Sequence, residues 1–259
     1  MDSVVVEKNN NIAFVTLNRI EKYNAFDDEM IENLSSIFKS LAECSATIAI
    51  VLKANGKHFS AGADLAWMKR MKNYSQADNF KDSKALAELL HNIYNNTKPV
   101  VASVQGCAFG GGVGLIAACD FAICTESSSF CFSETKLGLI PAVISPYVVK
   151  AIGQRQSKKL FLTAEKFNAE HALSYNLVQT VCRDNELADI TLKIVNQMTK
   201  NGPNSLFASK KLINDIAPLP VTENIQNLTA ERIALQRISA EGQEGLSAFF
   251  DKRQPKWDL

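Results

Sequence analysis

The chain has 259 residues, of which 46% are hydrophobic and 21% charged, and this composition argues against a fibrous or disordered protein. Its net charge of +1 gives no broad attraction to nucleic acid or a membrane surface. No run reaches the ~18 uninterrupted apolar residues of a membrane span, and the N-terminal residues lack the pattern of a secretory signal. We therefore expect a cytoplasmic protein whose six cysteines, none in a CxxC pair, are reduced core thiols.

Strands and helices alternate along the first half of the chain. Apolar patterns predict a β-hairpin from Val4 to Leu17, strands over 47–52, 99–104 and 120–124, and helices over 27–44, 76–95 and 111–119. This order implies right-handed crossovers and a parallel sheet. From about residue 146 onward the pattern is helical, with helices predicted over 147–152, 157–162, 169–175, 186–199, 205–216 and 221–240.

This change of pattern divides the chain into two parts. Residues 1–195 are expected to form an α/β core, and residues 196–259 a C-terminal helical region. The helical region is expected to pack on the core or on a neighbouring subunit.

The first segment with chemical character runs from Lys57 to Leu65, after the predicted strand at 47–52. The small residues at 60–63 allow the backbone to approach a ligand closely. Asp64 is placed to cap the helix that follows. Taken alone, the segment fits a small-residue turn with a helix cap better than a binding loop.

The second segment is the glycine run Gly110-Gly111-Gly112, between a predicted strand and an apolar helix. Free N–H groups at such a helix N-terminus stabilise negative charge. The phosphate-loop pattern GxxxxGK[ST] is missing, and so is the GxGxxG spacing with a later acidic residue. The run therefore favours a developing oxyanion over a nucleotide phosphate.

The third segment surrounds Glu134, which lies between aromatic and aliphatic residues. A carboxyl group in an apolar pocket has a raised pKa, which suits it to general acid–base catalysis. The alternative is a surface glutamate paired with Lys136, and Glu134 by itself favours that alternative.

Together these segments resemble the enoyl-CoA hydratase/isomerase, or crotonase, family along nearly the whole chain. The resemblance begins at residues 17–26, continues through 60–64 and the triple glycine, and ends at 249–253. Within the family, FSAGADLAWMKRM at 59–71 and PAVISPYVVKAIG at 141–153 look most like bacterial methylglutaconyl-CoA hydratases. The resemblance implies a spiral of β-β-α units with a helical C-terminal region, assembled as a homotrimer or a dimer of trimers.

The resemblance also implies catalytic roles. The backbone N–H groups of Ala63 and Gly111 would hold the thioester oxygen, and Glu134 would be the acid–base residue. Many hydratases of the family use a second glutamate, which would fall at Gly114 and is absent. Either Glu134 works largely alone, or another polar group or the substrate helps to hold the water.

Substrate binding is implied for a further set of positions, and no metal or cofactor is implied, because CoA arrives as part of the substrate. The residues expected to bind substrate or CoA are Lys22, Ala25, Ala61, Asp64, Leu65, Gly110, Gly114 and Lys252. Lys22, Lys252 and Arg253 are basic and suit the CoA phosphates, although solvated surface charge explains them equally well.

The leading hypothesis is hydration of 3-methylglutaconyl-CoA to 3-hydroxy-3-methylglutaryl-CoA, a step of leucine degradation. Lys69, Arg70 and Lys72 lie beside apolar residues and suit a terminal carboxylate of the acyl group. An enoyl-CoA isomerase, or a hydratase of another acyl-CoA, is the alternative among enzymes. An RNA-binding protein is the alternative from another class, but the charge balance offers it only the basic cluster at 69–72.

Overall fold

A six-stranded sheet forms the centre of the computed structural model, which describes residues 2–258. Its strand order is β1-β2-β3-β4-β6-β9. The first two strands form the predicted antiparallel hairpin, and the later neighbours pair in parallel. The strands are β1 (Val4–Asn9), β2 (Ile12–Leu17), β3 (Ala49–Ala54), β4 (Val100–Val104), β6 (Phe121–Thr125) and β9 (Thr180–Cys182).

A second, three-stranded sheet has the order β5-β7-β8. Its strands are β5 (Cys107–Phe109), β7 (Ser129–Cys131) and β8 (Lys166–Asn168). β4 and β6 of the large sheet are each followed by a strand of the small sheet, so the chain winds as successive β-β-α units. The predicted spiral is therefore confirmed.

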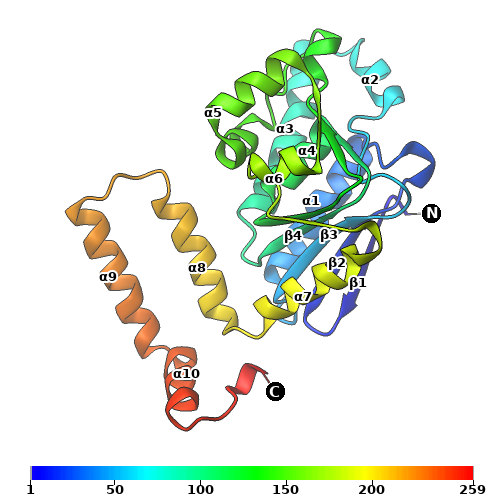
Figure 1. Cartoon of the computed structure of the whole chain (residues 1–259). Helices are drawn as coiled ribbons and strands as arrows, with labels where there is room; N and C mark the ends of the chain where they lie inside the picture. Colours follow the sequence, from blue (N-terminus) through cyan, green and yellow to red (C-terminus); the bar gives the residue numbers. More distant parts are fainter. Residues whose placement is uncertain (1, 259) are drawn as a thin grey trace.

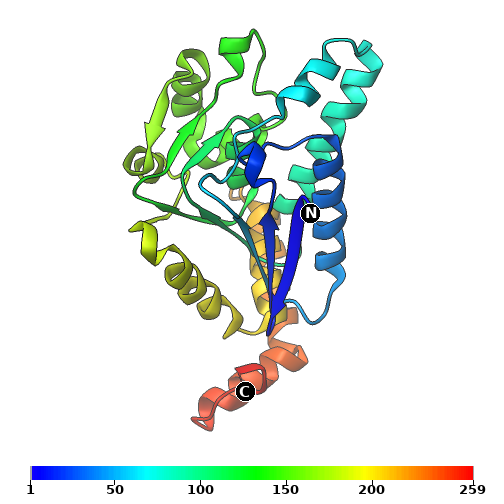
Figure 2. The same ribbon diagram turned by 90° about the vertical axis from the view of Figure 1, so that its right-hand side faces the viewer.

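Helices cover the two faces of the large sheet unequally (Figure 2). One face packs on α1 (Asp28–Glu43), α3 (Gln76–Tyr94) and α4 (Gly111–Ala118), and α5 (Ser145–Thr163) packs in turn on α4. The other packs on α7 (Leu187–Thr199), which contacts β3, β4 and β6. The shorter helical segments are α2 (Leu65–Met71), α6 (Ala169–Ser174), η1 (Ile20–Lys22), η2 (Glu134–Leu137), η3 (Asp184–Glu186) and η4 (Lys256–Asp258).

α1 shows how local sequence sets these elements. Asp27 caps it by accepting a hydrogen bond from the N–H of Met30 at 3.0 Å. Apolar residues at helical spacing then face the core, and five of them are buried: Met30, Ile31, Leu34, Phe38 and Leu41.

The last three helices leave the core as an arm (Figure 1). They are α8 (Pro203–Ile216), α9 (Glu223–Ile238) and α10 (Ala240–Phe250), and α10 contacts α8 and α9. The expected boundary at 195/196 falls within α7, whose Val195 and Met198 still pack on the sheet. α7 ends at Thr199, and α8 still contacts the core where Lys210 pairs with Asp120 at 2.7 Å.

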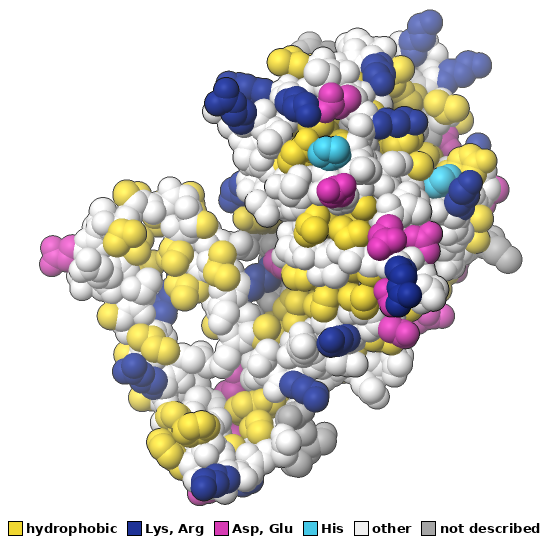
Figure 3. All heavy atoms as spheres, viewed as in Figure 1, with side chains coloured by type: hydrophobic (Ala, Val, Ile, Leu, Met, Phe, Trp, Pro, Cys, Tyr) yellow, Lys and Arg dark blue, Asp and Glu magenta, His cyan; other side chains and the backbone are white. Residues whose placement is uncertain are grey.

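The arm carries large apolar side chains that are exposed, some of them visible in Figure 3. They are Ile213, Leu219, Val221, Ile233, Leu235, Ile238, Leu246, Phe249 and Phe250. A protein surface seldom leaves so many apolar residues together in water.

Several expectations for the second half of the chain are wrong in detail. The region after residue 146 is not entirely helical, because it contributes β8 and β9. The helices predicted over 147–152 and 157–162 are joined in α5, which is interrupted at Gly153 with φ of +75°. The single helix predicted over 221–240 ends at Ile238, and α10 follows it.

The cysteines are all unpaired in the described residues, as predicted, but they are not all core residues. Cys124, Cys131 and Cys182 are buried. Cys44 lies at the surface, where the ammonium group of Lys8 donates to its sulfur at 3.4 Å. Among residues 2–258, no helix is long and apolar enough to cross a membrane.

Candidate active site

Arg19 ties together the segments that border the site. Its guanidinium donates to the carbonyl of Ala25 at 2.7 Å and pairs with Asp27 at 3.0 Å and Asp64 at 3.2 Å. Asp27 is the N-cap of α1 and Asp64 is the N-cap of α2. One largely buried cation therefore fixes the loop at 20–26 against the starts of two helices.

Asp64 caps α2, as predicted. Its carboxylate accepts hydrogen bonds from the N–H groups of Ala66 at 2.8 Å and Trp67 at 3.1 Å, and the residue is 4% exposed. Burial alone would raise the pKa of Asp64, but those donors, Arg19 and Lys22 together hold it below its ordinary value. The carboxylate is thus engaged by the protein itself.

The segments at 60–63 and 108–112 lie against each other. Ser60 and Ala108 form a parallel bridge. Gly62 has φ of +91°, and a Cβ on it would lie 2.9 Å from the carbonyl oxygen of Phe109. A Cβ on Gly112 would lie 2.9 Å from Cβ of Ser60 and 3.0 Å from its carbonyl oxygen. Only glycine allows these two backbones to approach so closely.

Two backbone N–H groups are available at this junction. Ala63 forms a bridge with Phe26, and a Cβ on Gly111 would lie 2.3 Å from Cζ of the same phenylalanine ring. Both residues therefore border Phe26. Within residues 2–258, the N–H groups of Ala63 and Gly111 donate no hydrogen bond. Gly111 also begins α4, where the first N–H groups have no helical partner. The arrangement suits an anionic oxygen.

Glu134 brings a carboxyl group to the head of α4. Its Oε1 would lie 3.1 Å from a Cβ on Gly110. Its Oε2 is buried without a hydrogen-bond partner among the described residues. Burial raises the pKa of Glu134, and a hydrogen bond with its own backbone offsets this only in part. No ion pair joins it to Lys136 among the residues the structure describes, so the alternative of a paired surface glutamate is wrong.

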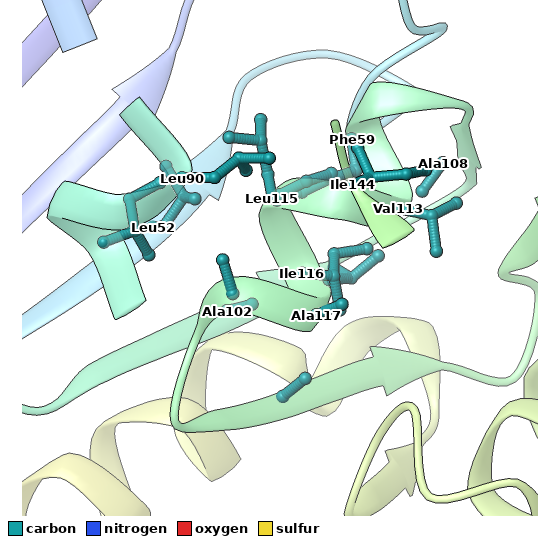
Figure 4. Packing of buried hydrophobic residues seen from close by; sticks show 14 of the residues in the cluster. Leu52, Phe59, Leu90, Ala102, Ala108, Val113, Leu115, Ile116, Ala117 and Ile144 are labelled. Carbon is teal, nitrogen blue, oxygen red and sulfur yellow. The ribbon is translucent and has the colours of Figure 1, made fainter. Parts of the chain in front are cut away.

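The position of the missing second glutamate is occupied by an apolar neighbour. A Cβ on Gly114 would lie 2.2 Å from Cγ2 of Ile144. Ile144 precedes α5 and belongs to the core cluster that includes Val113 and Leu115 of α4 (Figure 4). The site of this chain therefore presents one carboxyl group on this helix face.

The other predicted binding residues are only partly brought together. The Lys22 ammonium lies 3.9 Å from the Asp64 carboxylate and remains about half exposed. The N–H of Ala61 donates to the Tyr23 carbonyl at 2.9 Å, which anchors its backbone to the loop at 20–26. Leu65 is 82% exposed at the start of α2. Lys22, Ala25, Ala61, Asp64 and Leu65 thus lie in one region.

Lys252 stands apart from this region within one chain, because it follows α10 on the arm (Figure 1). The neighbouring Arg253 is held by Glu244, with hydrogen bonds of 2.7 and 3.1 Å. Arg253 is therefore less available to a phosphate than Lys252.

Three residues with clear structural roles at the site were missed by the sequence reasoning. Arg19 and Phe26 lie within the segment at 17–26 that resembles the family, so the sequence could have singled out their positions. It could not have predicted their contacts. Ile144 gave no signal in the sequence, because its contact with Gly114 joins residues 30 positions apart.

The comparisons with known proteins agree with this geometry. A model of the family Enoyl-CoA hydratase/isomerase matches residues 7–259. The chain belongs to the enoyl-CoA hydratase/isomerase, or crotonase, family. It is thus an enzyme of the enoyl-CoA hydratase/isomerase type, which acts on acyl-CoA thioesters. The predicted family is confirmed, and the methylglutaconyl-CoA subtype stays a prediction.

Individual relatives cover nearly the whole chain. A crystal structure from Legionella pneumophila, described as a candidate enoyl-CoA hydratase/isomerase (crotonase), is 48% identical with a TM-score of 0.95, covering 98% of both chains. An enoyl-CoA hydratase of Shewanella pealeana is 40% identical with a TM-score of 0.96, covering 99% of this chain and 96% of the other. A trans-2-decenoyl-[acyl-carrier-protein] isomerase of Streptococcus mutans is 30% identical, covering 98% and 97%.

Proposed function

We propose that the enzyme hydrates a branched, acidic enoyl-CoA, converting 3-methylglutaconyl-CoA to 3-hydroxy-3-methylglutaryl-CoA. The observation that carries a proton-transfer role is the buried, unpaired Oε2 of Glu134 beside the head of α4. A desolvated carboxylate is a stronger base than one in water. CoA enters as part of the substrate, and the proposed reaction needs no redox cofactor.

The proposed chemistry balances with one water molecule. Glu134 takes a proton from the water while the water oxygen bonds to Cβ of the substrate, and the π electron pair moves to the thioester oxygen. The N–H groups of Ala63 and Gly111 stabilise this enolate oxygen because they point at the charge as it develops. Glu134 then returns the proton to Cα, and the thioester carbonyl re-forms.

One of the three cations considered for the acyl carboxylate already has a partner. Arg70 is already engaged, because its guanidinium lies 2.5 Å from the carboxylate of Asp28. Lys69 and Lys72 form no ion pair among the described residues. We assign the terminal carboxylate to Lys69 or Lys72, where a charge-assisted contact contributes ~1.5–3 kcal/mol, a factor of about ten to a hundred.

The test compares kcat/KM for 3-methylglutaconyl-CoA, 3-methylcrotonyl-CoA and crotonyl-CoA. The first is expected to be the best substrate, and Lys69→Ala or Lys72→Ala should reduce that preference about tenfold or more. Arg70→Ala is the matched control and should keep it. A better rate with crotonyl-CoA contradicts the branched-acid assignment. A preference that survives both lysine variants contradicts only the assignment of the cation.

Isomerisation is the second candidate, and the apolar contact between Ile144 and Gly114 favours it. Moving a double bond needs one base that shifts a proton between two carbons, and this site presents one carboxyl group. A straight-chain 3-enoyl-CoA separates the two reactions, because an isomerase yields the conjugated 2-enoyl-CoA without added water. Absorbance of the conjugated thioester records that product.

We also propose assembly as a homotrimer or a dimer of trimers, in which the arm packs on a neighbouring copy. The support is the set of exposed apolar residues on α8–α10, including Phe249 and Phe250. The same placement would bring Lys252 to the CoA phosphates of a neighbouring site. Sedimentation equilibrium should give three or six copies, and Lys252→Ala should raise KM with little change in kcat. A stable monomer would contradict this assembly.

A further inference from the structure

Ile144 lies directly over Gly114. A Cβ on Gly114 would lie 2.2 Å from Cγ2 and 2.8 Å from Cβ of Ile144, far inside contact distance. Ile144 is 2% exposed, and its carbonyl accepts a hydrogen bond from the N–H of Val148 at 3.1 Å. The residue is therefore enclosed by the core and anchored to the first turn of α5.

The Ile144 side chain and the Glu134 carboxyl group both approach the N-terminal end of α4. Gly110 and Gly114 are four residues apart, and the Gly114 N–H donates to the Gly110 carbonyl at 3.3 Å. Gly110 is the N-cap of α4, with φ of +50°, and Gly114 lies in the first turn of that helix. Because Glu134 lies beside Gly110 and Ile144 beside Gly114, both side chains meet the N-terminal turn of α4.

We propose that Ile144 limits the active site to a single acid–base carboxyl group, by filling the space that an acidic side chain at position 114 would need. This inference rests on the proposed role of Glu134. Ile144 acts as a positioning residue, because it determines which groups face the reacting carbons without taking part in proton transfer. Every proton transfer in the reaction must then pass through Glu134.

The contact distances dictate the design of the variants. Alanine at 144 would keep the Cβ that lies 2.8 Å from the new side chain, so Ile144→Gly is needed. The informative pair is Ile144→Gly with Gly114→Glu, and Ile144→Gly with Gly114→Gln is its matched control. Both pairs replace four side-chain carbon atoms of Ile144 with a side chain of five heavy atoms, and only one pair adds an acid.

The assay uses crotonyl-CoA, so failure of the methylglutaconyl-CoA assignment leaves this test intact. The wild-type enzyme should show one ionisation on the acid limb of its pH–kcat/KM profile. The Glu-containing pair should hydrate at least tenfold faster than the Gln-containing pair and show a second ionisation. Equal rates in the two folded pairs, or two ionisations in the wild type, would overturn the proposal.

A smaller change keeps the proposal testable if those pairs do not fold. Gly114→Ala alone should lower the melting temperature, because its Cβ meets Ile144. The same substitution should cost less when it is made in an Ile144→Gly background, with Ile144→Gly alone as the reference. A wild-type melting temperature for Gly114→Ala would show that Ile144 does not block the position. Normal turnover by Glu134→Gln would instead contradict the proposed function, which depends on that residue.

Discussion

Replacing Glu134 with glutamine keeps the shape of the side chain and removes its titrating group. Loss of a positioned general acid–base group lowers kcat by ~10² or more, which is about 2.7 kcal/mol of transition-state stabilisation at 1.36 kcal/mol per tenfold. KM should change little, because the CoA contacts proposed here lie elsewhere. Stopped-flow or steady-state absorbance of the enoyl thioester measures both constants.

The same carboxyl group sets the pH dependence. Burial raises the pKa of Glu134 above its ordinary 4.5, so the acid limb of kcat/KM should fall at a higher pH than an exposed glutamate would give. Because the folded state binds this proton more tightly than the unfolded chain, the Glu134 contribution to stability is lost as pH rises through the folded pKa. Glu134→Gln should therefore be the more stable protein at neutral pH, and the difference should vanish below 4.5.

A neighbouring substitution provides the control. Lys136→Gln changes an exposed residue of the same short helix and should leave kcat unchanged. Near-normal turnover by Glu134→Gln, with Lys136→Gln equally active, would refute the assignment of Glu134. A large loss in both variants would restore the interpretation of a charged surface pair.

Two further substitutions test the backbone and the helix cap that border the site of Glu134. Gly111→Ala should lower kcat by ~10²–10³, because its Cβ meets the Phe26 ring at 2.3 Å and tilts the N–H. Adding Phe26→Leu to that variant should raise kcat again by at least about tenfold. Full activity of Gly111→Ala alone would place the oxyanion site elsewhere. Asp64→Ala should cost ~2–4 kcal/mol in urea unfolding at pH 7, because it removes the α2 cap and leaves Arg19 short of a partner. The pKa of Asp64 is lower in the folded state than in the unfolded chain. The stability difference between wild type and Asp64→Ala should therefore shrink as pH falls through the folded pKa, below 3.8. A stability loss that does not depend on pH would contradict the charge-based explanation.

The regular elements of the core were predictable because their patterns are long. The apolar spacing in α1 and the continuous apolar run of β3 both appear where expected, within one or two residues. β5, β7, β8 and β9 have three residues each, too few for an alternating pattern to be distinguished from a loop. Their pairing is set by partners distant in the sequence.

The site residues also differ in how far the sequence alone could predict them. Glu134 and the glycine run were predicted as site residues because several local motifs together resemble one family. The Arg19 network and the contact of Ile144 with Gly114 depend on side chains that meet only after folding. The direction of the arm away from the core, which separates Lys252 from the other binding residues, is likewise a property of tertiary packing.

The cysteines differ in burial and in pKa, so their rates of chemical labelling can report local opening of the fold. Hydrogen bonds from Thr47 and Lys8 lower the pKa of Cys44 to about 7, so its thiolate is available to an alkylating reagent near neutral pH. Burial raises the pKa of Cys124 to about 12 and also raises that of Cys182. These two thiols lie on neighbouring strands β6 and β9 at the end of the large sheet. Cys44 should therefore be labelled immediately, and the later labelling of Cys124 and Cys182 should measure how often this sheet edge separates.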